Sequence, residues 1–76
     1  MATNRIGNTI KLLRVSKDLS IVELGEQLKV TAQTIRNWEK GRNDPTVNAL
    51  LEMCKIFGVT FSAFEIDNEL KLQRKE

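Results

Sequence analysis

The stretch Ser20–Gly41, SIVELGEQLKVTAQTIRNWEKG, decides the predicted fold, because its residues indicate two short helices joined by a tight turn. The first helix begins after Ser20, and Glu23 three positions later completes a capping box, in which each side chain bonds the backbone N–H of the other residue. The second helix is capped by Thr31 and stops at Gly41. So short a connection fixes one helix relative to the other, which is typical of a helix-turn-helix.

The second of these helices has two chemically different faces. At 100° per residue, Ile35 and Trp38 point to one side, so Trp38 is interpreted as a core residue rather than a platform for stacking bases. The opposite side carries four side chains that bond base edges or phosphates, namely Gln33, Arg36, Asn37 and Lys40. A solvated helix face is the plainer interpretation of such residues, but the paired, capped helices favour a role in binding.

The residue types on that outer face match the chemistry of the DNA major groove. Arginine bonds guanine through two hydrogen bonds, and glutamine and asparagine bond adenine in the same way. Ala32 at the helix start is small enough to let the backbone approach and to touch a thymine methyl group. We therefore expect base readout by four residues: Ala32, Gln33, Arg36 and Asn37.

Composition limits the classes of protein that this chain can represent. Its 76 residues suffice for one small domain, and 41% hydrophobic with 29% charged residues is ordinary for a globular protein. Cys54 is the single cysteine and histidine is absent, so the sequence predicts no disulfide, no metal site, no cofactor and no enzyme active site. The sequence shows neither a signal peptide nor the ~20 apolar residues of a membrane span, so we expect a cytoplasmic protein.

The charges are distributed unevenly along the chain. Residues 1–43 hold eight basic and four acidic side chains, whereas residues 44–76 hold four basic and six acidic ones. A basic half that contains the two-helix stretch suits a polyanionic partner, although a mixed solvated surface explains the asymmetry equally well. Lys11, Lys17, Arg42 and Asn43 are general candidates for phosphate contacts, and each is as readily interpreted as a solvated side chain.

The rest of the chain predicts three more helices and a tail. Thr3 or Asn4 caps a first helix that ends near residues 17–18, Thr46 caps a fourth that ends at Gly58, and Thr60 caps a short fifth turn or helix. The prediction is an all-α fold of five helices, with a domain over residues 1–64. Residues 65–76 form a charged tail whose apolar spacing fits a strand, a helix or a frayed terminus.

With these residues in view, the chain resembles the lambda-repressor/Cro-like helix-turn-helix family. The similarity runs from Leu12 to Phe64 and rests on a combination of positions: Thr34-Ile35, Trp38-Glu39-Lys40-Gly41, Pro45, Leu50-Leu51 and Phe57-Gly58-Val59. It implies a compact five-helix bundle with the third helix in the major groove. It also implies base contacts from Ala32, Gln33, Arg36 and Asn37, backbone contacts from Thr34, Arg42 and Asn43, to which we add Lys40, and a structural ion pair of Arg14 with Glu39.

At three positions the sequence departs from the family pattern or from ordinary helix propensity. Family members often carry glutamine where this chain has Ile21, so a phosphate at that helix start must be held by backbone N–H groups. Lys29 replaces the usual glycine between the helices, which predicts mild strain or a slightly different turn. Gly25 lies in mid-helix at a cost of roughly 1 kcal/mol against alanine, and close approach of another helix is one reason for it.

Two functions from different classes fit this sequence. The first is a sequence-specific regulator of transcription that binds double-stranded DNA as a homodimer on an inverted repeat, with helix five and the tail as the dimer interface. The second is a protein-interaction module, such as an antitoxin-like or adaptor protein, that keeps the fold with weak or no DNA binding. Neither function calls for a membrane or a small-molecule substrate.

Overall fold

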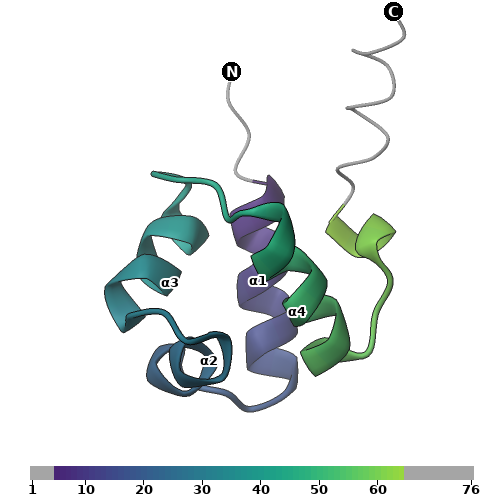
Figure 1. Ribbon diagram of the computed structural model, residues 1–76, viewed down its shortest axis with the longest axis horizontal. Helices are drawn as coiled ribbons and strands as arrows, with labels where there is room; N and C mark the ends of the chain where they lie inside the picture. Colours follow the sequence, from purple (N-terminus) through teal and green to yellow (C-terminus); the bar gives the residue numbers. More distant parts are fainter. Residues whose placement is uncertain (1–4, 65–76) are drawn as a thin grey trace, which may run out of the picture.

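Four α-helices and one 3-10 helix make up the computed structural model, which describes residues 5–64 (Figure 1). The elements are α1 (Arg5–Ser16), α2 (Ile21–Leu28), α3 (Ala32–Lys40), α4 (Val47–Phe57) and the 3-10 helix η1 (Phe61–Phe64). Over this range the fold is all-α, as predicted, and none of these helices is long and apolar enough to cross a membrane. The cap expected at Thr3 or Asn4 and the tail 65–76 lie outside the described residues.

Three of the predicted helix caps, at Ser20, Thr31 and Thr46, are present where the sequence placed them. Ser20 Oγ accepts a hydrogen bond from the Glu23 N–H at 3.0 Å, and Glu23 Oε1 accepts one from the Ser20 N–H at 2.8 Å, which completes the capping box. Thr31 and Thr46 accept equivalent bonds at the starts of α3 and α4. Each such cap stabilises its helix by about 1 kcal/mol, so these hydroxyls fix where the helices begin.

The fifth helix is not an α-helix, which corrects the prediction of a five-helix bundle. Residues 61–64 form one 3-10 turn, in which the Ala63 N–H donates to the Thr60 carbonyl at 3.0 Å. The turn has three residues per repeat, so Phe61 and Phe64 fall on the same side. Their rings meet edge to face with centroids 6.4 Å apart. Phe64 is fully buried.

A single apolar core joins all five elements. Its buried members are Ile10, Leu24, Ile35, Trp38, Leu50, Met53, Phe57 and Phe64. The helix α3 packs against both α1 and α2, while η1 covers α1 and α4 at the opposite end (Figure 1). Cys54 packs against this core, and desolvation raises the pKa of its thiol. The core therefore holds α3 by its inner side and leaves its outer side to solvent.

The turn between α2 and α3 is built from backbone contacts. Lys29 ends α2 in the left-handed conformation at φ 63°, a region where a β-carbon costs about 1 kcal/mol. The next N–H, that of Val30, donates to the Gly25 carbonyl at 2.9 Å. A β-carbon on Gly25 would lie 2.8 Å from the Val30 carbonyl oxygen. The glycine is thus required by the backbone of the turn itself, rather than by another helix as the sequence suggested.

Candidate nucleic-acid interface

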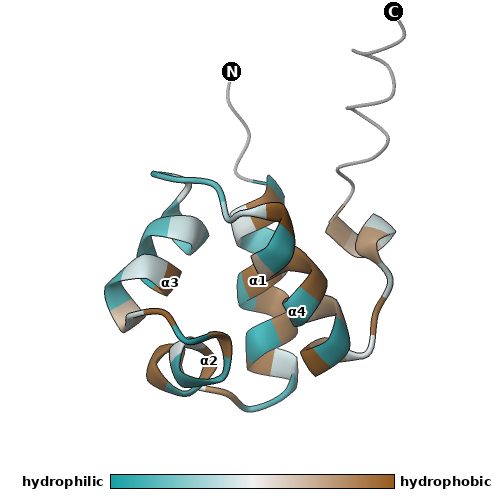
Figure 2. Ribbon diagram, viewed as in Figure 1, coloured by the Kyte–Doolittle hydropathy of each residue, from teal (hydrophilic) through white to brown (hydrophobic). Residues whose placement is uncertain are grey.

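The helix α3 buries the side that sequence periodicity assigned to the core and exposes the other. Ile35 is fully buried and Trp38 is 7% exposed. On the outer side Gln33, Arg36 and Lys40 are exposed, whereas Ala32 and Asn37 are half-buried. Figure 2 shows the outward ribbon of α3 and the loop after it as mostly hydrophilic. The residues predicted to read bases therefore share one accessible helix face.

Two of these residues are already connected to each other and to the following loop. Gln33 Nε2 donates to Asn37 Oδ1 at 3.1 Å, one helical turn away, and Arg42 Nη1 donates to the same oxygen at 3.4 Å. The backbone brings Arg42 there: Gly41 adopts φ 79°, and the Arg42 N–H donates to the Asn37 carbonyl at 2.9 Å. Together with the bond from the Gly41 N–H to the Trp38 carbonyl at 3.1 Å, this bond forms a Schellman motif, which turns the chain back over the last turn of α3.

The remaining residues predicted to contact the DNA backbone lie at both ends of α3. Thr34 is half-buried near the start, where its hydroxyl is 2.8 Å from that of Thr31. Arg42 and Asn43 are exposed in the loop after the helix, and Lys40 is exposed on its last turn. A helix of nine residues is about 13 Å long, so these groups flank the face that is predicted to read bases, instead of forming one cluster.

The ion pair that the family resemblance implies is present between α1 and α3. Arg14 Nε donates to Glu39 Oε2 at 2.7 Å, and the guanidinium also reaches Glu39 Oε1 at 3.2 Å. A third donor of the same group, Nη1, bonds the Leu19 carbonyl at 2.8 Å. The two side chains are only 12% and 7% exposed. Arg14 thereby joins α1, the loop before α2, and α3.

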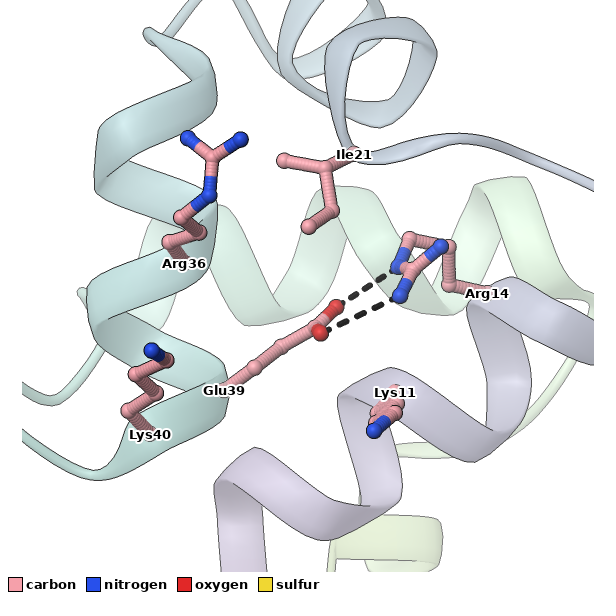
Figure 3. Close-up of a pocket in the computed structure, with 6 residues that line it drawn as sticks. All are labelled: Lys11, Arg14, Ile21, Arg36, Glu39 and Lys40. Carbon is pink, nitrogen blue, oxygen red and sulfur yellow. Dashed lines mark hydrogen bonds and ion pairs between the residues drawn. The ribbon is translucent and has the colours of Figure 1, made fainter.

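A positively charged pocket of about 230 Å³ lies beside this ion pair (Figure 3). Its lining is Lys11, Arg14, Ile21, Arg36, Glu39 and Lys40. Arg36 and Lys40 extend from α3, Lys11 extends from α1, and Ile21 from the start of α2 lies between Arg36 and the ion pair. Since Glu39 offsets Arg14, the other three cations leave the pocket positive, and such concavities concentrate anions.

Lys11 is the residue of this pocket to which the sequence gave no specific role. Lys11 precedes Arg14 by three positions, so the two side chains are neighbours on one face of α1. That spacing places Lys11 beside the ion pair once Arg14 is known to bond Glu39. The signal was therefore present in the sequence, but it depended on a contact between residues far apart along the chain.

Comparison with known proteins assigns the family. The model of the helix-turn-helix family matches residues 10–64, so the chain belongs to this family, and the resemblance to its lambda-repressor/Cro-like members is confirmed.

Among relatives, the HTH-type transcriptional activator BcrR of Enterococcus faecalis is 34% identical over 61 residues, which is 80% of this chain and 30% of BcrR. The chain thus spans less than a third of that relative's length. An uncharacterised HTH-type transcriptional regulator of Methanocaldococcus jannaschii is 36% identical over 52 residues, covering 68% of this chain and 79% of the relative.

Solved structures share the fold. Two crystal structures of the clp gene regulator ClgR from Corynebacterium glutamicum superpose with TM-scores of 0.74 and 0.75 at 22% sequence identity. They cover 88% and 95% of this chain, and 90% and 81% of the ClgR chains. At this level of identity the similarity establishes the arrangement of helices and nothing about the ligand.

Proposed function

We propose that this chain is a sequence-specific regulator of transcription that places α3 in the major groove of double-stranded DNA. The observation that carries the proposal is the exposed outer face of α3, whose polar side chains are flanked by the positive pocket and fixed from behind by the core. The family assignment and the regulators among its relatives support the same function. Its site of action is then the cytoplasm.

In this proposal Ala32, Gln33, Arg36 and Asn37 contact base edges. Four further residues contact phosphates: Thr34, Lys40, Arg42 and Asn43. The positive pocket adds a place for a phosphate at the start of α2, where Ile21 offers no polar side chain. Helix geometry leaves the first N–H groups of α2 without intrahelical acceptors, and Lys11 and Lys40 line the same pocket as Ile21. The two lysines take over, in part, the role of the glutamine that is usual in the family.

The direct test is selection of bound sequences from a random duplex library, followed by affinity measurements on the selected site. Gln33→Ala and Arg36→Ala should each weaken binding by about 1–3 kcal/mol and relax the preference at one base position. Lys55→Ala, which removes an exposed cation from α4, is the matched control and should leave the preference unchanged. If both α3 variants bound the selected site as tightly as the wild type, the assignment of base readout would be wrong.

The phosphate role of the pocket has a separate signature. Lys11→Ala should weaken binding to all sequences alike and reduce the slope of log affinity against log salt by about 1, because one fewer counterion is released. Lys55→Ala removes an exposed cation from α4, outside the pocket lining, and serves as control, with a salt slope expected at the wild-type value. A salt slope that stays at the wild-type value in Lys11→Ala would remove this residue from the interface.

We also propose that the protein binds as a homodimer on an inverted repeat. One module of this size makes few base contacts, and two half-sites one helical turn apart (~34 Å) supply affinity and specificity together. The proposed interface includes η1 and the tail. Truncation after Phe64 tests it by sedimentation: the truncated chain should be monomeric where the full chain is dimeric. A dimer of unchanged affinity would exclude the tail.

A protein-interaction module is the second candidate, and one observation favours it. Several large apolar side chains are exposed, among them Leu12 at 70% and Val47 at 63%, and they offer apolar surface to a protein partner. Titration of fluorescently labelled genomic duplex fragments, with and without added salt, separates the two functions. A regulator binds some fragments far more tightly than others at moderate salt, whereas an interaction module shows no such difference.

A further inference from the structure

The amide of Asn37 is oriented by the protein itself before any partner binds. Its oxygen accepts hydrogen bonds from Gln33 Nε2 at 3.1 Å and from Arg42 Nη1 at 3.4 Å. A guanidinium donates only, so it faces the oxygen of the amide and disfavours the flipped orientation, which would present an NH2 group to it. The Arg42 guanidinium therefore determines which side of the Asn37 amide carries the oxygen and which carries the NH2 group.

The backbone keeps Arg42 in that place. The Arg42 N–H bonds the Asn37 carbonyl at 2.9 Å and the Gly41 N–H bonds the Trp38 carbonyl at 3.1 Å, both parts of the Schellman motif. Arg42 thus returns over Asn37 through main-chain bonds that do not depend on its side chain. Replacement of the side chain should leave this path of the chain intact.

From this geometry we propose that Arg42 is a positioning residue that restricts Asn37 to donating hydrogen bonds, so that Asn37 prefers guanine over adenine. The inference rests on the proposed function. With its oxygen occupied twice, Asn37 offers an NH2 group, which suits the adjacent acceptors O6 and N7 of guanine; adenine presents N7 beside an NH2 donor. Gln33 uses one N–H toward Asn37 and keeps its oxygen and second N–H, the pair that suits adenine.

The experiment compares base preferences of the full chain and its variants in selections from one random duplex library. Asn37→Ala first identifies the position that Asn37 reads, as the one where preference is lost. At that position the wild type should favour guanine over adenine by about fivefold or more. In Arg42→Ala, which frees the amide to turn, this ratio should fall by about fivefold, in addition to a general loss of affinity from one missing phosphate contact.

Three further variants separate positioning from charge. Lys40→Ala removes a neighbouring cation that does not bond the Asn37 amide, and it should weaken binding without changing the ratio. Asn37→Asp keeps oxygen acceptors and removes the donor, so the guanine preference should disappear. Rescue is expected in Arg42→Lys, since an ammonium also donates only.

Each contrary result has a defined meaning. An unchanged ratio in Arg42→Ala, an equal fall of the ratio in Lys40→Ala, or a wild-type preference for adenine at the Asn37 position would overturn the inference while leaving the proposed function standing. A wild type that enriches no sequence at all would overturn the proposed function, and the inference with it.

Discussion

Arg14 and Glu39 show how one pair of residues places the proposed reading helix. Glu39→Ala removes both carboxylate acceptors of a guanidinium that is only 12% exposed, and a charge left in such a place is costly. We expect a loss of about 2–3 kcal/mol in the free energy of unfolding, measured by urea denaturation. The matched control is Glu52→Ala, whose partner Lys55 lies 3.6 Å away on the surface, with an expected change below about 0.5 kcal/mol. Equal effects of the two variants would contradict a structural role for the pair.

Lys29 is a second residue whose effect on the free energy of unfolding can be tested. Because its φ of 63° suits glycine better than lysine, Lys29→Gly should raise the free energy of unfolding by about 0.5–1 kcal/mol. Gly58→Ala is the mirror experiment, since Gly58 has φ 71° and open space around its missing β-carbon, and it should lower stability by about 1 kcal/mol. Chemical denaturation of both variants measures the effect. A destabilised Lys29→Gly would show that the lysine side chain contributes more than its backbone costs.

Single residues also show where prediction from sequence reached its limit. The caps were predictable because a cap and its partner lie three residues apart. The bond from Arg14 to Glu39 spans 25 positions, and the family resemblance supplied it where periodicity did not. The shared oxygen of Asn37 was not predicted, because Arg42 reaches it only through the left-handed turn at Gly41.

At the scale of elements, the relation of α2 to α3 depends on Gly25. Gly25→Ala should gain about 1 kcal/mol of helix propensity, yet its β-carbon would lie 2.8 Å from the Val30 carbonyl oxygen, a backbone atom. We expect a net loss of about 1–3 kcal/mol, as for other overpacked sites. Thermal unfolding followed by circular dichroism provides the measurement, with Gln27→Ala on the exposed side of α2 as control. A Gly25→Ala variant more stable than the wild type would mean that the backbone of the turn shifts easily to make room for the β-carbon.

The elements themselves were largely predictable, and the exception has a physical cause. Each of α2, α3 and α4 begins after a hydroxyl cap, and α3 and α4 end at a glycine. The last turn was less certain because two phenylalanines three residues apart suit either a short α-helix or a 3-10 turn. The contacts of η1 with α1 and α4 decide between them, and these contacts are long-range.

At the scale of the molecule, Phe64 closes the core from the far end of the described chain. Phe64→Ala should cost about 3–5 kcal/mol, a large share of the stability of so small a domain, and should lower the midpoint of thermal unfolding by more than about 10 °C. Phe61→Ala, at a half-buried position in the same turn, is the control and should cost less. Equal midpoints of thermal unfolding for the two variants would show that η1 does not complete the core.

The division of α3 into a buried side and an exposed side has a consequence for how such a protein evolves. The core and ion-pair contacts of α3 come from buried or half-buried residues such as Ile35, Trp38 and Glu39, whereas the proposed readers Gln33 and Arg36 are exposed. Substitution of an exposed side chain away from caps and ion pairs usually alters stability by less than about 0.5 kcal/mol. A lineage can therefore exchange its target sequence one position at a time without passing through an unstable intermediate.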